Sequence, residues 1–174
     1  LSINILDGPD VMIMTNTPHC IGSDIMFQGS GADSYAWTGP HGCTSALQDP
    51  VISDSDLTDS GLYTLIGTNT NGCRDSITTN INVFPLPVVM ATADQAEYCE
   101  EETIQLNVNS GTSYTWSGPD GFTSNLQSPS IFNSTTAQQG TYTIQISDVN
   151  GCTNQGQVSI LVISSPAVTI AGDV

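Results

Sequence analysis

The sequence predicts an all-β protein built from tandem β-sandwiches, and three observations support this fold class. Segments such as Thr103–Val108, Tyr142–Ile146 and Val158–Val162 alternate apolar and polar residues, which is the period of half-buried strands. No segment keeps a helical period for three turns. Turn-forming Asn-Gly pairs at Asn71-Gly72 and Asn150-Gly151 predict hairpins of type I′, a turn that needs positive φ twice. About seven short strands per repeat are typical of a sandwich.

The two halves of the chain repeat one another without a gap. Ser34–Pro50 recurs as Ser113–Pro129, and Trp37 matches Trp116 at an offset of 79 residues. The same offset relates further pairs, namely Cys20 and Cys99, Tyr63 and Tyr142, Cys73 and Cys152, and Pro87 and Pro166. We therefore expect two domains of one kind in tandem.

Both ends of the chain resemble parts of further repeats. Residues 3–9 resemble residues 81–87, and residues 166–173 resemble residues 87–94. The predicted organisation is a last strand of a preceding repeat (1–8), repeat 1 (9–86), repeat 2 (87–165) and a first strand of a following repeat (166–174). The chain is expected to be a window from a longer array; generous fragment boundaries are the alternative, and they too imply a longer parent.

The charge balance excludes several classes of function. One basic residue, Arg74, stands against 17 acidic residues, which gives a formal net charge of −16. Such a surface repels nucleic acids and anionic lipid headgroups. Charged residues make up only 10% of the chain, so Ser, Thr, Asn, Gln and Gly must form most of a surface typical of secreted proteins. No apolar run is long enough to predict a membrane span.

The segment Asp59–Leu65 indicates which kind of β-sandwich each repeat forms. It is similar to the strand-F signature of immunoglobulin-like domains, in which a glycine permits the corner and the Tyr hydroxyl bonds back to the upstream backbone. We therefore expect four aromatic residues in the structural core, Trp37, Tyr63, Trp116 and Tyr142. The position two residues after each Tyr, usually Cys in that family, is Leu65 or Ile144, so the usual inter-sheet disulfide is absent.

Five cysteines in an acidic chain point to an oxidising, extracellular compartment. Cys20 and Cys99 precede a predicted strand, whereas Cys73 and Cys152 follow the Asn-Gly turns. Because the separation is the same in both repeats, the most parsimonious of the three possible connectivities pairs Cys20 with Cys73 and Cys99 with Cys152.

The fifth cysteine, Cys43, is left as an unpaired thiol. Its counterpart in repeat 2 is Phe122, so we interpret it as a small apolar residue that fills a core or edge position. A cross-link to another chain is the alternative.

The pattern as a whole, a Cys before strand B, then Tyr-x-Trp-x-Gly-Pro-x-Gly, Gly-x-Tyr-Thr and Asn-Gly-Cys, resembles the Ig-like or PKD-like repeats of Bacteroidetes surface proteins. The resemblance covers both full repeats. It implies a very large cell-surface or secreted protein, often an adhesin of the gliding-motility type exported by type IX secretion. The motifs identify the module and do not say what the parent protein binds.

Catalysis is not expected. His19 and His41 are the only imidazoles, and neither recurs in repeat 2, where Tyr98 and Asp120 take their places. The sequence contains no nucleophile elbow, zinc-protease motif or phosphate loop.

Two acidic clusters are candidate calcium sites, because Ca²⁺ prefers hard oxygen ligands. One cluster lies in the loop before strand F and consists of Asp54, Asp56 and Asp59. The other lies near the junction of the repeats and consists of Asp94, Glu97, Glu100, Glu101 and Glu102. Solvated acidic surface is the favoured alternative for both clusters, and no other cofactor is predicted.

One modification site is a hypothesis. The tripeptide Asp75-Ser76-Ile77 resembles the short O-glycosylation motif of the same bacterial group, which makes Ser76 a candidate glycan acceptor. Four aromatic residues could stack on sugars, but their regular repetition favours packing; they are Tyr35, Trp37, Tyr114 and Trp116.

The predicted function is therefore structural or adhesive, a non-catalytic segment of a long extracellular surface fibre or adhesin stalk. The alternative is a spacer or binding module of a secreted hydrolase. Expected partners are neighbouring repeats of the same chain, and surface glycans or other copies of the fibre. Nucleic acid is not an expected partner.

Overall fold

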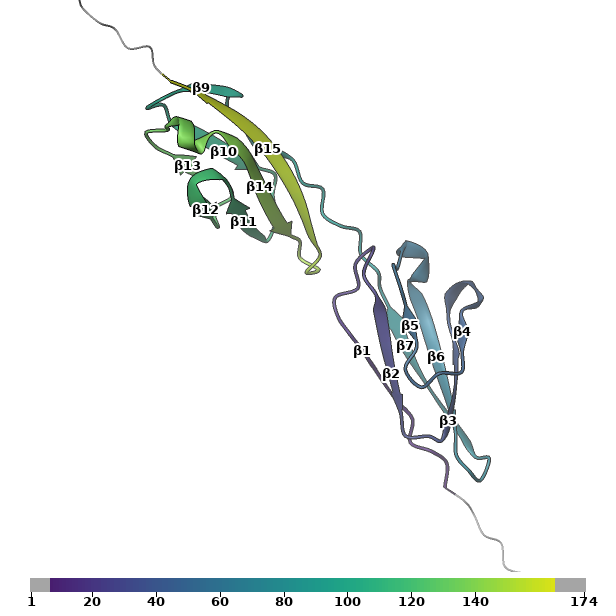
Figure 1. Ribbon diagram of the computed structural model, residues 1–174. Helices are drawn as coiled ribbons and strands as arrows, with labels where there is room; N and C mark the ends of the chain where they lie inside the picture. The colour runs from purple at the N-terminus through teal and green to yellow at the C-terminus, as the bar shows by residue number, and fades with distance from the viewer. Residues whose placement is uncertain (1–6, 165–174) are drawn as a thin grey trace, which may run out of the picture. The chain divides into compact units, whose positions relative to one another are not determined.

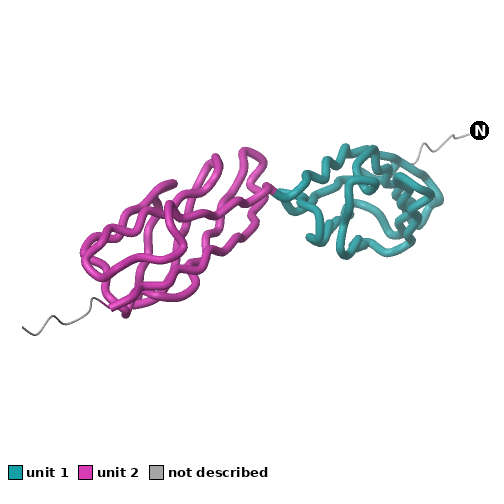
Figure 2. The backbone as a smooth tube through the Cα atoms, turned by 90° about the horizontal axis from the view of Figure 1, so that it is seen from above, with its two compact units in different colours: residues 1–86 teal, residues 87–174 magenta. Residues whose placement is uncertain are grey.

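The computed structural model describes residues 7–164, which form two compact units. Unit 1 spans Leu1–Leu86 and unit 2 spans Pro87–Val174 (Figure 2). The strand assigned to a following repeat, 166–174, lies outside the described residues, as do residues 1–6 of the strand assigned to a preceding repeat.

Unit 1 is an all-β sandwich of two antiparallel sheets (Figure 1). One sheet has the order β1-β2-β5 and the other the order β4-β3-β6-β7. The elements are β1 (Met12–Thr15), β2 (Ile25–Ser30), β3 (Ser34–Thr38), η1 (Pro40–Gly42), β4 (Thr44–Ser45), β5 (Val51–Ile52), η2 (Leu57–Asp59), β6 (Gly61–Thr68) and β7 (Arg74–Ile81). Residues 7 and 8, predicted as the end of a strand, are irregular.

Unit 2 repeats this architecture. Its sheets have the orders β13-β10-β8 and β12-β11-β14-β15-β9. The elements are β8 (Ala91–Ala93), β9 (Glu97–Cys99), β10 (Ile104–Val108), β11 (Ser113–Ser117), η3 (Pro119–Gly121), β12 (Thr123–Ser124), β13 (Ser130–Ile131), η4 (Thr136–Gln138), β14 (Gly140–Ser147) and β15 (Thr153–Ile163). Among the described residues, no helix is long and apolar enough to cross a membrane.

The alternating pattern in the sequence places one side of each strand in a core. In β10 the burial alternates along Ile104–Val108, and the same alternation runs along β6 and β14. Trp37 and Trp116 are buried with 3% and 0% of their surface exposed. Each indole Nε1 donates a hydrogen bond to a loop carbonyl, that of Leu47 at 2.9 Å or Leu126 at 3.0 Å. The indole therefore ties this loop to the core.

The two core tyrosines form the corner that the sequence predicts. Tyr63 donates its hydroxyl proton to the Asp59 carbonyl at 2.9 Å, and Tyr142 donates to the Gln138 carbonyl at 2.8 Å. Both rings are buried. The predicted bond back to the upstream backbone is confirmed in both units.

The Asn-Gly hairpins differ from the prediction. Gly72 and Gly151 have positive φ, but the asparagines before them do not, so these turns are not type I′. A polar side chain supports each loop instead, since Asn69 Oδ1 accepts from the backbone N–H of Cys73. The turns with two consecutive positive φ angles lie at His41-Gly42 and at the matching positions of unit 2.

The predicted disulfide pairs are wrong, because each pair would join opposite ends of one sandwich. Cys99 lies opposite Ile163 at the end of β15, whereas Cys152 directly precedes the first residue of that strand. At about 3.3 Å per residue the strand separates them by roughly 30 Å, and a disulfide needs Cα atoms within about 7 Å. Cys99 is a free, exposed thiol, and Cys152 is disulfide-bonded.

The same geometry excludes the first pair. Cys20 lies opposite Phe84, beyond the end of β7, while Cys73 directly precedes Arg74, where β7 begins. Cys20 is disulfide-bonded. Within each unit, the two cysteines that recur in the repeat therefore lie at opposite ends of the last long strand.

Stability should fall at alkaline pH because burial raises the pKa of three tyrosines, Tyr63, Tyr98 and Tyr142, to about 12. The pKa of Tyr in an unfolded chain is about 10. Between about pH 10 and about pH 12 the unfolded state therefore loses phenolic protons that the folded state retains, which favours unfolding. We expect the free energy of unfolding, measured with urea, to decrease across this window and to show no contribution from these groups below it. A constant value up to about pH 12 would contradict the assignment.

Candidate functional site

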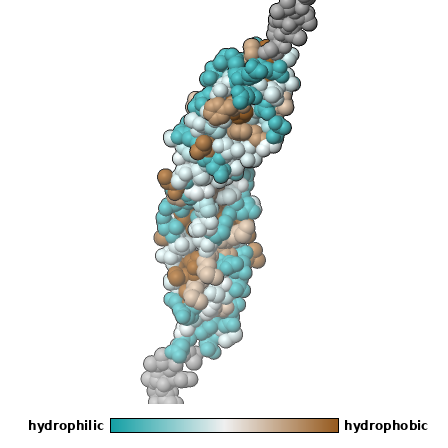
Figure 3. Space-filling view, turned by 90° about the vertical axis from the view of Figure 1, so that its left-hand side faces the viewer, coloured by the Kyte–Doolittle hydropathy of each residue, from teal (hydrophilic) through white to brown (hydrophobic). Residues whose placement is uncertain are grey.

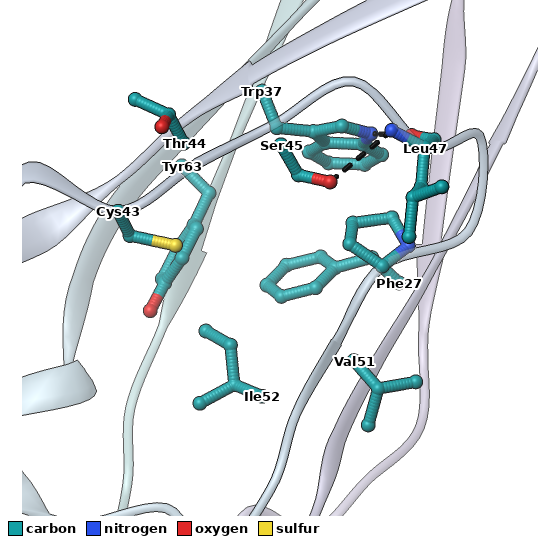
Figure 4. Close-up of a pocket in the computed structure, with 10 residues that line it drawn as sticks. Phe27, Trp37, Cys43, Thr44, Ser45, Leu47, Val51, Ile52 and Tyr63 are labelled. Carbon is teal, nitrogen blue, oxygen red and sulfur yellow. Dashed lines mark hydrogen bonds between the residues drawn. The ribbon is translucent and has the colours of Figure 1, made fainter.

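An apolar pocket of about 180 Å³ opens between the two sheets of unit 1 (Figure 4). Its walls combine core aromatic side chains with the loop that follows β3. The lining residues are Phe27, Trp37, Cys43, Thr44, Ser45, Leu47, Pro50, Val51, Ile52 and Tyr63. None of them is charged, so the pocket suits an apolar group.

The floor of the pocket consists of packed aromatic rings, and its rim is exposed. The Phe27 ring packs against Trp37 and Tyr63, with centroids 5.2 Å and 4.8 Å apart. Leu47 and Val51, at the rim, expose 66% and 53% of their surface. Figure 4 shows the sulfur of Cys43 beside the Tyr63 ring, while Val51 and Ile52 lie on the opposite side.

Unit 2 has a phenyl ring at the position of Cys43. Phe122 follows η3 and packs edge-on against Tyr142, with the ring centroids 5.4 Å apart and the ring planes at 73°. Cys43 is half-buried and packs against the core of unit 1, which agrees with its interpretation as a small apolar residue at a core or edge position, and the pocket beside it stays open. Phe27, which replaces Leu106, occupies only part of the missing volume.

This pocket was not predicted from the sequence. Three of its lining positions differ between the repeats, namely Phe27 for Leu106, Cys43 for Phe122 and Val51 for Ser130. The first and third place a larger side chain in unit 1 and the second a smaller one, so side-chain size alone does not reveal an open pocket.

The acidic loop of unit 1 uses its carboxylates as helix caps. Asp56 accepts hydrogen bonds from the backbone and hydroxyl of Thr58, and Asp59 accepts from the backbone N–H of Asp56, which forms a capping box around η2. The hydrogen bonds from the Thr58 hydroxyl and from the Thr58 backbone N–H lower the pKa of the Asp56 carboxyl. Asp54 is adjacent in a left-handed conformation and its N–H donates to Asp24.

The residues of the second acidic cluster also make separate local contacts. Glu102 accepts from the backbone N–H of Cys99, and Asp94 accepts the hydroxyl proton of Tyr98. Glu97 pairs with Leu161 in the parallel β9–β15 ladder. The backbone N–H groups of Glu100 and Glu101 donate to Ile163 and Ser134. Within residues 7–164, no three His, Cys, Asp or Glu side chains are grouped so that they could hold a metal ion, and neither predicted cluster comes together as one.

Calcium binding can be tested by thermal melting with and without EDTA. We expect the two melting curves to coincide, because the carboxylates of Asp56, Asp59, Asp94 and Glu102 bond to backbone groups or neighbouring side chains, and no three acidic groups of residues 7–164 are placed to hold an ion. A melting temperature that falls on chelation and returns with added Ca²⁺ would restore the calcium hypothesis.

The other predicted residues do not assemble into a catalytic arrangement among the described residues. His19 is buried, burial lowers its pKa, and its Nδ1 has no hydrogen-bond partner. His41 lies in the turn of η1. Tyr35 and Tyr114 donate to nearby loop carbonyls and are half-buried. Ser76 is exposed on β7 and accessible to a modifying enzyme.

Apolar residues on the surface shown in Figure 3 are scattered among polar ones. Two strongly exposed apolar side chains of unit 2 are Phe132, at 72%, and Val149, at 89%. Single exposed apolar residues are common, so neither is a site by itself.

No protein-family profile and no curated protein matches this sequence. The chain is similar in fold to solved structures of murine CEACAM1b (14% identity, 88% of this chain and 100% of that chain, TM-score 0.43). It is also similar to the mouse nectin-like molecule 4 ectodomain, Ig1–Ig3 (14% identity, 94% of this chain and 67% of that chain, TM-score 0.41). A third similar structure contains the N-terminal eight Ig domains of Down Syndrome Cell Adhesion Molecule (14% identity, 89% of this chain and 25% of that chain, TM-score 0.47). The similarity to these three structures is one of fold.

Proposed function

We propose that this chain is a non-catalytic segment of an extracellular surface fibre or adhesin stalk, built from tandem immunoglobulin-like repeats. The observation that carries the proposal is the recurrence of the same elements and the same Trp and Tyr core bonds 79 residues apart. A chain that duplicates its framework while its loops diverge is suited to length and presentation.

The surface chemistry supports an extracellular setting. The net charge of −16 keeps separate molecules apart and soluble. Cys20 and Cys152 are disulfide-bonded, which fits an oxidising compartment. The resemblance to Bacteroidetes repeats makes a gliding-motility adhesin exported by type IX secretion the finer form of the proposal, with neighbouring repeats and surface glycans as partners.

Immunogold electron microscopy of native cells tests this function with an antibody raised against the fragment. Gold strung along thin filaments that leave the cell is the expected result. Gold found only in the medium, together with a hydrolytic activity, would favour the module of a secreted hydrolase.

Glycosylation of Ser76 stays a proposal of its own. It predicts that the intact mass of the native protein exceeds the sequence mass and that Ser76→Ala removes the excess. An intact mass equal to the sequence mass would exclude the modification.

A further inference from the structure

The pocket of unit 1 has the chemistry to receive one aromatic ring from outside. In unit 2 the equivalent space holds the Phe122 ring on Tyr142. In unit 1 the matching Tyr63 is present and buried, but the ring is replaced by the smaller Cys43, and about 180 Å³ stays open. A cavity of about 150 Å³ is large enough for benzene. The fold itself therefore shows which chemical group fits here.

A single exposed aromatic ring is present on the other repeat. Phe132 follows β13 in unit 2 and exposes 72% of its surface, whereas its counterpart in unit 1 is Ser53. Repeat 1 thus has the pocket without the exposed ring, and repeat 2 has the exposed ring without Cys43. The two differences between the repeats are complementary.

The loop of unit 2 that follows Phe132 is itself uncharged. The acidic residues Asp54, Asp56 and Asp59 of unit 1 are replaced there by Asn133, Thr135 and Gln138. Acidic side chains still flank this loop, because Ser134 bonds through its backbone to Glu101 and Glu102, whose counterparts Gly22 and Ser23 are uncharged. Charge therefore does not favour the contact, and apolar burial has to drive it.

We propose that the Phe132 ring of one copy of this chain inserts into the unit 1 pocket of a second copy. Each copy offers one ring and one pocket on different surfaces, so the contact is heterologous and can continue from copy to copy. A contact through one ring is weak for an isolated fragment. An array that presents several such contacts at once gains by avidity.

The expected salt dependence distinguishes this contact from ionic association. Copies that each carry a charge of −16 repel one another, and salt screens this repulsion while leaving apolar burial intact. Self-association, measured by sedimentation velocity, should therefore increase with added NaCl.

Disulfide trapping tests the contact even when it is short-lived. In a Cys99→Ser background, which removes the exposed thiol, Phe132→Cys is oxidised and the products are separated on a non-reducing gel. The matched control is Val149→Cys, at a more exposed apolar position of the same unit. We expect covalent dimers and larger species only for Phe132→Cys, with peptide mapping placing the bond between positions 43 and 132. Cross-linking equal to the control, or a bond formed within one chain, would overturn the proposal.

Substitutions that copy the sister repeat provide a second test without altering the fold. Cys43→Phe fills the pocket as in unit 2, and Phe132→Ser removes the ring as in unit 1. Each should reduce self-association several-fold at high salt, whereas Val149→Thr, which copies Thr70, should retain it. Variants that associate like wild type would refute the contact, and so would a wild-type chain that stays monomeric at high salt while Phe132→Cys gives no cross-link above the control.

Discussion

Replacement of Trp116 by alanine is expected to lower the free energy of unfolding of unit 2 by about 3–5 kcal/mol. The indole is fully buried, and its Nε1 bonds to the Leu126 carbonyl. Truncation leaves a cavity in the core and also leaves that carbonyl without its donor. Because ordinary domains are stable by only about 5–15 kcal/mol, this loss is a large share of the stability of one unit.

The chain offers its own control for this measurement. It contains two tryptophans, one in each unit, so in Trp116→Ala the remaining fluorescence reports on unit 1 through Trp37. Urea unfolding followed by fluorescence should stay close to the unit 1 transition of the wild type, while circular dichroism should show an earlier transition from unit 2. A loss below about 1 kcal/mol would mean that Trp116 is not the centre of this core.

Gly118→Ala is expected to lower the free energy of unfolding by about 2–3 kcal/mol through a steric clash. Gly118 has an extended backbone, which alanine can adopt, so its conformation is not the obstacle. A Cβ at this position would lie 2.6 Å from Cε1 of Tyr142 and closer still to Cδ1. The Tyr142 ring is buried, and its hydroxyl is bonded to Gln138, so it can move away only by losing that bond.

Gly121→Ala is the control for Gly118→Ala. Gly121 has φ +70, and a Cβ there would meet nothing within 4 Å. Only backbone strain remains, which should cost about 1 kcal/mol. The two variants also differ in the titration of Tyr142, because only the clash exposes the ring and returns its pKa toward the ordinary value. Equal losses for the two variants, with no change in that titration, would contradict the steric argument.

The strands and the core could be predicted from the sequence because both depend on local patterns. Alternation along Thr103–Val108 reflects a strand with one buried face, and it is found as β10. The corner tyrosines were predictable for a similar reason, since the Gly and Tyr spacing determines which backbone carbonyl the hydroxyl can reach.

The disulfides could not be predicted from spacing. The equal separation of the cysteines in the two repeats shows that they occupy equivalent places, but it does not show that they are close together. Distance depends on the register of a strand pair, here Cys99 opposite Ile163, which places the cysteine at the far end of β15 from Cys152. The prediction of type I′ turns was wrong for a related reason. The Asn69 side chain supports a loop conformation that the Asn-Gly pair alone does not specify.

The pocket depends on packing between distant residues, which a single position does not reveal. Cys43 in place of Phe122 predicts a deficit of side-chain volume, whereas Phe27 in place of Leu106 and Val51 in place of Ser130 predict a compensation. Only the positions of Trp37 and Tyr63 around the Phe27 ring show that the compensation is incomplete.

The recurring cysteines lie at opposite ends of the last long strand of each sandwich, which excludes a cross-link between the two within one unit. A bond between them would have closed a long loop and restricted the unfolded chain, and neither unit has that constraint. Oxidation or reduction of the exposed Cys99 thiol should therefore leave the circular dichroism of unit 2 unchanged.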